Sequence, residues 1–141
     1  LNEKDLIKFN KLISNKNITF HGEISEDSKY KLFEKVKIFA FPSLYGEGLP
    51  RVLLEAQIFK CLTLTTNFPG CEDAISPVMK RFLCSDTLKS TIESLEKAIL
   101  LEDKSILNSI TEEAHNWVNE HHNIPNIINK YSKIFSSTNF I

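Results

Sequence analysis

The sequence predicts an α/β fold in which a parallel sheet is flanked by helices and followed by a helical tail. Ile38 to Phe41 is a short apolar run bounded by a breaker, which is typical of a buried strand, and Cys61 to Thr65 predicts a short strand of leucine and threonine. Segments with apolar residues at helical spacing lie before, between and after these runs. Because strands that alternate with helices form parallel sheets with right-handed crossovers, this order of elements indicates one such sheet.

The length and composition fit one globular domain. The chain has 141 residues, of which 42% are hydrophobic and 25% are charged, and this is enough to bury a core. The net charge of −1 gives no basic excess, so we expect no nucleic-acid partner. No apolar run is long enough to cross a bilayer, and no signal peptide is visible. The chain begins at Leu1 rather than at methionine, so we expect either a natural fragment or an engineered piece of a longer protein.

The cysteines and histidines predict neither a disulfide framework nor a metal centre. Cys61, Cys71 and Cys84 are too few and too scattered for a framework, and none forms a C-x-x-C pair. A reducing cytoplasm is therefore the compartment that we expect. The adjacent His121 and His122 would point in different directions on a helix, which makes a poor metal pair. The sequence also lacks the G-x-S-x-G elbow of serine hydrolases and the Walker motif of NTPases.

The first quarter of the chain predicts a helix, a strand and a second helix. Glu3 to Ile13 carries apolar side chains on one side of a helix. Asn17 to Phe20 predicts a strand that runs into a turn at Gly22. Ser25, which two acidic residues follow, is a good N-cap, and apolar residues continue this second helix as far as Val36.

A strand, a glycine loop and a helix form the centre of the sequence. Proline and serine stop the strand that begins at Ile38, and Gly46 and Gly48 give the next loop conformational freedom. Pro50 is expected in the first turn of the following helix, where its missing N–H costs nothing. Apolar residues continue this helix at helical spacing, namely Val52, Leu53, Ala56 and Phe59.

The second half of the chain predicts a turn, two short elements and three long helices. Residues 67–70 form the turn. Glu72 to Ile75 is expected to begin a short helix that Pro77 limits, and Arg81 to Cys84 to supply another short strand. The helices are expected at Thr87 to Leu101, Lys104 to His122 and Pro125 to Phe135, before a frayed end at residues 136–141. We therefore divide the chain into an α/β portion, residues 1–86, and a helical tail, residues 87–141.

The start of the central helix is suited to bind an anion. Its unpaired N–H groups and the positive end of the helix dipole both favour phosphate. Glu47 in the loop and Glu55 on the helix flank this place, with seven residues between them. Carboxylates would repel a phosphate, so we expect them to accept hydrogen bonds from neutral hydroxyl groups. A diphosphate with a hydroxyl-rich group at each end, a nucleotide sugar, satisfies these demands.

At these residues the sequence resembles a known enzyme family. Glu47 and Glu55 within PSLYGEGLPRVLLEA resemble the signature of retaining glycosyltransferases with two Rossmann-like domains (GT-B fold, family 4). The segment TTNFPGCEDAI resembles that family's next cleft-facing turn. The resemblance implies that the chain is the later part of the C-terminal, donor-binding domain, with its Rossmann-like parallel sheet. The N-terminal acceptor domain would then lie outside the chain, as would the basic residues that usually clamp the diphosphate.

The resemblance also implies a role for each acid. Glu47 would be the catalytic residue and hold hydroxyls of the donor sugar, and Glu55 would accept the ribose hydroxyls. Each has a plainer interpretation: Glu47 as a solvated loop acid, and Glu55 as a helix-surface acid paired with Arg51, worth about 0.2–0.5 kcal/mol at most. Backbone N–H groups, which Pro50 lacks, would meet the diphosphate at Gly48, Leu49 and Arg51.

Further residues take their expected roles from the same resemblance. Backbone at Gly22 and Ile24 would border the nucleobase, and Ser43 would cap or line the loop. The turn that begins at Pro69 would face the cleft, although Asp73 stands where the family usually has a glutamate.

The predicted function is that of a glycosyltransferase fragment. It would bind a nucleoside-diphosphate sugar, with UDP as the expected nucleotide, for retaining transfer to an acceptor hydroxyl. The expected pathway is synthesis of surface polysaccharide or lipid-linked glycan, in the cytoplasm or at the inner face of the cell membrane. The partners would be the donor, a sugar or lipid-linked acceptor, and the N-terminal domain of the same enzyme. We expect no cofactor, since the sequence lacks a D-x-D carboxylate cluster.

Two alternatives stay open at this point. One is a binding module, because the chain alone would hold nucleotide weakly and catalyse nothing. The other is a phosphorylase-like or epimerase enzyme, which the same fold allows. Assays of transfer to an acceptor, of phosphorolysis and of epimer formation from the donor alone separate these alternatives.

Overall fold

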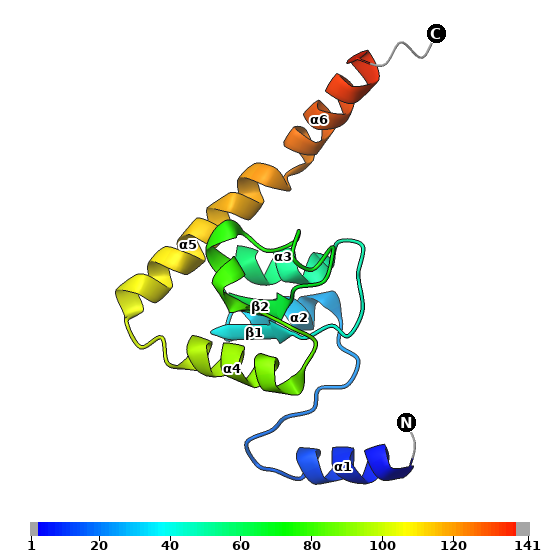
Figure 1. Cartoon of the computed structure of the whole chain (residues 1–141), viewed down its shortest axis with the longest axis vertical. Helices are drawn as coiled ribbons and strands as arrows, with labels where there is room; N and C mark the ends of the chain where they lie inside the picture. Colours follow the sequence, from blue (N-terminus) through cyan, green and yellow to red (C-terminus); the bar gives the residue numbers. More distant parts are fainter. Residues whose placement is uncertain (1–2, 138–141) are drawn as a thin grey trace. The chain divides into compact units, whose positions relative to one another are not determined.

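A computed structural model describes residues 3–137 of the chain. The described residues form two compact units, which meet in the sequence between Leu32 and Phe33. Figure 1 gives the elements and their labels. The predicted α/β class is confirmed, because a three-stranded parallel sheet is flanked by helices as in a Rossmann-like half of a GT-B fold.

The first unit contains one complete helix and most of a second. Helix α1 spans Glu3–Ile13, as predicted. Helix α2 spans Glu26–Phe33 and begins after Ser25, whose Oγ accepts a hydrogen bond from the N–H of Ser28 at 3.3 Å. The predicted cap is therefore confirmed, but α2 ends at Phe33 and does not continue to Val36.

The predicted strand at Asn17 to Phe20 is wrong. Residues 18–20 have no regular structure, and the strands of the described residues all lie in the second unit. The side chain of Phe20 is 62% exposed and meets the ring of Phe9 edge-on, with the ring centroids 5.0 Å apart. An apolar run becomes a strand only when a neighbouring strand pairs its backbone, and in the described part of the chain no strand does so here.

The sheet of the second unit has the order β1-β2-β3, and both strand pairs are parallel. Strand β1 spans Ile38–Phe41 as predicted, and β2 spans Leu62–Thr66, one residue later than predicted. Strand β3 is only Leu83–Cys84. The rest of the strand predicted from Arg81 belongs to a 3-10 helix, η1, at Pro77–Phe82. Glu72 to Ile75 forms turns instead of the predicted short helix.

Helices cover both faces of the sheet (Figure 1): α3, Arg51–Ile58, lies on one face and α4, Leu88–Ile99, on the other. Helix α5, Lys104–His121, packs against α3 and η1, and α6, Ile124–Ser137, follows it. Residues 138–141 of the predicted frayed end lie outside the described residues, while Ser136 is helical. Helices α4 and α5 complete the core, which comprises Leu53, Leu62, Leu64, Cys71, Ala74, Ile75, Met79, Phe82, Cys84, Ala98, Ile110 and Ala114.

The three cysteines are buried and free. None of the described helices is long and apolar enough to cross a membrane.

Candidate functional site

Side-chain hydrogen bonds from β2 hold the end of β1 and the start of the loop that follows it. The Oγ1 hydroxyl of Thr65 on β2 donates to the carbonyl oxygen of Phe41 at 2.7 Å. That of Thr66 donates to the carbonyl oxygen of Ser43 at 3.0 Å. Ser43 in turn donates through its Oγ to the carbonyl oxygen of Tyr45 at 2.9 Å. These hydrogen bonds fix the path of the chain where it leaves the carboxyl end of β1, which is where ligands bind in open parallel sheets.

The glycine loop rests on the turn that follows β2. The N–H of Glu47 donates to the carbonyl oxygen of Pro69 at 3.3 Å. Gly70 has a φ of +82°, which L side chains rarely adopt, and a β-carbon there would collide with the carbonyl oxygens of Glu47 and Gly48. The two segments that carry the family resemblance are therefore in direct contact.

Helix α3 begins without help from a side chain at its N-cap. Pro50 occupies that position, one residue before the first turn predicted for it, with φ −63° and ψ 106°. It provides no side-chain acceptor, whereas Thr87 and Asp103 cap α4 and α5 through their side chains. The first amides of α3 therefore remain available to a polar ligand, which the helix dipole favours if it is an anion.

Glu47 and Ser43 line a cavity of about 340 Å³ beside the loop, together with residues 40–42, 44 and 45. A β-carbon built at Gly48 has no atom of the other described residues within 4 Å, apart from its chain neighbours, so the backbone there has room for a ligand. Leu49 is 43% exposed. Four of the predicted site residues thus lie along one short loop, at the carboxyl end of β1.

Glu55 lies on the second turn of α3, outside the lining of that cavity. Its side chain is only 17% exposed, and its Oε2 atom is buried. The nearest guanidinium nitrogen of Arg51 is 4.0 Å from its Oε1, and the arginine side chain is 82% exposed. Because the arginine side chain is mostly exposed and the distance is long, this ion pair adds little stability.

The two remaining predicted site residues, Gly22 and Ile24, lie in the first unit. Gly22 has a φ of +63°, which fits the predicted turn, and Ile24 is 39% exposed.

Gln57, for which the sequence predicts no role, joins α3 to the turn after β2. It is fully buried and uses its whole amide group. The Nε2 group donates to the carbonyl oxygens of Leu53 at 2.9 Å and of Ala74 at 2.8 Å, and Oε1 accepts from the N–H of Ser76 at 2.9 Å. One available signal was its position four residues after Leu53, because this spacing puts a polar side chain on the buried face of the helix.

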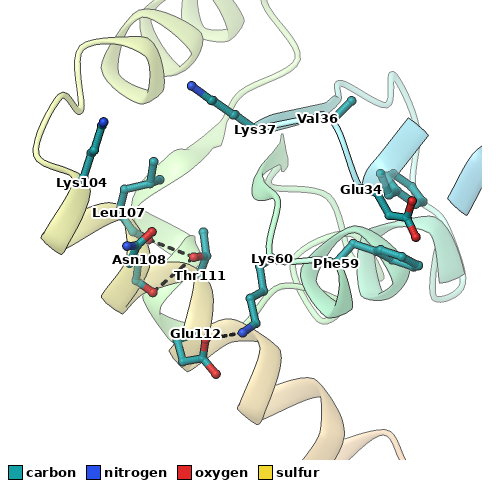
Figure 2. A pocket seen from close by; sticks show the side chains of 11 residues that line it. Glu34, Val36, Lys37, Phe59, Lys60, Lys104, Leu107, Asn108, Thr111 and Glu112 are labelled. Atoms are coloured by element: carbon teal, nitrogen blue, oxygen red, sulfur yellow. Dashed lines mark hydrogen bonds and ion pairs between the residues drawn. The ribbon is translucent and has the colours of Figure 1, made fainter. Parts of the chain in front are cut away.

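At the C-terminal end of α3, side chains of α5 contact the last turn. Nδ1 of His115 lies 2.7 Å from the carbonyl oxygen of Ile58, and Nε2 of the same ring lies 2.9 Å from Nδ2 of Asn119. Figure 2 shows the cavity beside this end, of about 600 Å³, and the ion pair between Lys60 and Glu112 at its border. The hydrogen bond from Lys60 is the main cause that lowers the pKa of Glu112.

A family model described as "Glycosyl transferases group 1" matches residues 2–122, which is most of the chain. The chain belongs to this family. A search of curated proteins returned no match. Membership in the group 1 glycosyltransferases implies glycosyl transfer as the general activity, with a nucleotide-sugar donor and an acceptor as the general partners. Within residues 3–137 of this glycosyltransferase domain, no three His, Cys, Asp or Glu side chains come together in a way that could hold a metal ion.

Proposed function

We propose that this chain is the donor-binding part of a retaining glycosyltransferase of GT-B family 4, with a UDP-sugar as its donor. One observation carries the proposal: the loop at residues 43–49 leads from the carboxyl end of β1 into an α3 whose N-cap, Pro50, offers no side-chain acceptor. Membership in the glycosyltransferase family supports it, because such an enzyme must hold a nucleotide sugar.

The diphosphate would lie at the start of α3. The backbone N–H groups of Gly48, Leu49 and Arg51 would donate to its oxygens, and the open space beside Gly48 supports a close approach. Negative charge grows on the diphosphate as the bond to the sugar breaks. Fixed amides and the helix dipole stabilise that charge without having to reorganise. Ser43 would hold the loop in shape through its bond to the carbonyl oxygen of Tyr45.

The two acids would bind the two hydroxyl-rich ends of the donor. Glu47 would accept hydrogen bonds from the sugar hydroxyls at the reacting end, which makes it the catalytic residue of the set. Glu55 would accept those of the ribose. The low exposure of the Glu55 side chain supports a binding role, because a nearly buried carboxylate makes stronger hydrogen bonds than a solvated one.

The remaining parts of the proposal concern the enzyme as a whole. An N-terminal domain of the same enzyme would supply the acceptor site, so that the 141-residue chain alone binds donor weakly and transfers no sugar. Residues 1–86 would form the α/β portion of the donor domain and residues 87–141 its helical tail. The enzyme would build surface polysaccharide or lipid-linked glycan in the cytoplasm or at the inner membrane face.

Calorimetric titration of the chain with UDP, GDP and ADP tests the nucleotide and the role of Glu55. We expect UDP to bind most tightly and Glu55→Gln to weaken UDP binding by roughly tenfold or more, because hydrogen bonds to a charged group contribute about 1.5–3 kcal/mol. Glu93→Gln on α4 is a matched control, since Glu93 also pairs with a basic residue four positions away. Equal UDP affinity in Glu55→Gln and in the unsubstituted chain would remove the ribose assignment.

The sugar assignment needs a donor with its sugar attached. In the enzyme that contains this domain, we expect Glu47→Gln to slow transfer by roughly a hundredfold or more while UDP alone binds as before. Undiminished transfer by this variant would show that Glu47 does not act on the donor sugar.

A further inference from the structure

We propose that Gly70, Asp73 and Gln57 are positioning residues, which hold the backbone of Glu47 in the conformation that binds the donor. This inference rests on the proposed function, because it concerns the same site. None of these three residues needs to touch the donor. They would act through the support turn, residues 69–76.

The first contact is between the support turn and the glycine loop. Gly70 approaches so closely that a β-carbon there would collide with the carbonyl oxygens of Glu47 and Gly48. These are backbone atoms, so they can yield only if the loop itself moves. The N–H of Glu47 adds a hydrogen bond of 3.3 Å to the carbonyl oxygen of Pro69. A shift of the support turn would therefore move the backbone of the proposed catalytic residue.

Hydrogen bonds within the support turn, and one to the residue before it, hold it in shape. The Oδ2 atom of Asp73 accepts from the N–H of Gly70 at 3.3 Å. The N–H of Ala74 donates to the carbonyl oxygen of Gly70 at 3.1 Å, and that of Glu72 to the carbonyl oxygen of Phe68 at 3.0 Å. Asp73, which is shorter than the glutamate usual at this position, thus stabilises the turn by accepting a hydrogen bond from the N–H of Gly70.

Gln57 joins the support turn to α3. Its amide group bonds to Ala74 and Ser76 in the turn and to Leu53 in the helix, and it is fully buried. The helix whose first amides would bind the diphosphate is thereby fixed to the turn on which Glu47 rests. The glycine loop and the start of α3 are thus both connected to the support turn. Such support matters because a site that is displaced by about 1 Å can lose most of its activity.

A double-mutant cycle distinguishes positioning from mere stabilisation. The probes are UDP and whichever of UDP-glucose and UDP-N-acetylglucosamine binds the full chain more tightly, measured by NMR titration. We expect Gly70→Ala to weaken UDP-sugar binding by about tenfold, but by less than about threefold when Glu47→Gln is already present. A loss of the same size in both backgrounds would overturn the inference, because Gly70 would then not act through Glu47.

A matched control exists in the same loop. Among the described residues, the only atom within 4 Å of a β-carbon built at Gly46, apart from its chain neighbours, is the carbonyl oxygen of Pro69 at 4.0 Å, so Gly46→Ala should leave UDP-sugar binding unchanged. If it weakens binding as much as Gly70→Ala does, the loop does not tolerate any substitution and the inference fails.

Asp73 gives a test that does not depend on the folding of Gly70→Ala. Asp73 is exposed, so its substitution should leave the fold intact. We expect Asp73→Ala to weaken UDP-sugar binding by about threefold or more and Asp73→Asn, which keeps the acceptor, to restore it. Equal affinity in all three proteins would contradict the inference. If Glu47→Gln alone has no effect on UDP-sugar binding, the proposed function itself fails, which is a distinct result.

Discussion

The two ends of helix α3 differ in their side-chain contacts. At its end, side chains from α5 close the helix: His115 contacts the carbonyl oxygen of Ile58, and Glu112 pairs with Lys60. At its start, Pro50 offers no side-chain acceptor, and a glycine loop leads into the helix. The end of α3 is thus bound to α5, whereas its start is the place where we propose that the donor binds. Substitutions at the two ends should therefore separate stability from donor binding.

Gln57→Leu should have the largest effect, because this residue joins α3 to the support turn. The substitution leaves the carbonyl oxygen of Ala74 and the N–H of Ser76 buried without their present partner. We expect the free energy of unfolding to fall by roughly 3 kcal/mol, since each buried unsatisfied group costs about 1–3 kcal/mol. Urea unfolding monitored by circular dichroism measures this loss. A loss below about 1 kcal/mol would mean that the turn and the helix hold together without Gln57.

Gly48→Ala should affect binding at the start of α3 and leave stability intact. A β-carbon there meets nothing within 4 Å, so the folded chain accommodates it, and alanine also restricts the unfolded chain. We expect UDP affinity to fall by about tenfold, because the methyl group would lie where the diphosphate approaches. Calorimetry measures the affinity, and a thermal melt checks the fold. Unchanged UDP affinity would place the diphosphate elsewhere.

His115→Ala should produce the opposite result at the end of α3. The carbonyl oxygen of Ile58 loses its side-chain partner, which we expect to cost about 1 kcal/mol of unfolding free energy. UDP affinity should not change. Asn119→Ala, which removes only the second contact of the same ring, should cost less. A drop in UDP affinity in His115→Ala would show that the two ends are not independent.

His122 should have the smallest effect, visible only as a pH dependence. Burial, together with the charges of Lys130 and His121, lowers the pKa of His122 from its usual 6.5. The unfolded state then binds more protons near pH 6, so the stability that the neutral ring provides is lost as the pH falls below about 6.5. Melting temperatures at pH 7.5 and 5.5 should differ slightly less in His122→Asn. An equal or larger difference in this variant would contradict the assignment.

Local sequence signals predicted the elements that carry the site. The run Ile38 to Phe41 is bounded by breakers and became β1 at the predicted residues. The strand predicted at Asn17 to Phe20 failed, since its own residues could not reveal that no described strand would pair with it. Gln57 bonds to residues 17 and 19 positions away, and His115 contacts a residue 57 positions away. Such contacts depend on the folded arrangement, which no local pattern contains.

The most direct test of the central claim is an amide-resolved NMR titration of the chain with UDP. If the diphosphate binds at the start of α3, the amide signals of Gly48, Leu49 and Arg51 should shift most. The amide signals of the support turn should shift less. The signals beside the cavity at the other end of the helix, such as Lys37, Lys60 and Lys104, should stay in place. Shifts confined to this second group would contradict the claim.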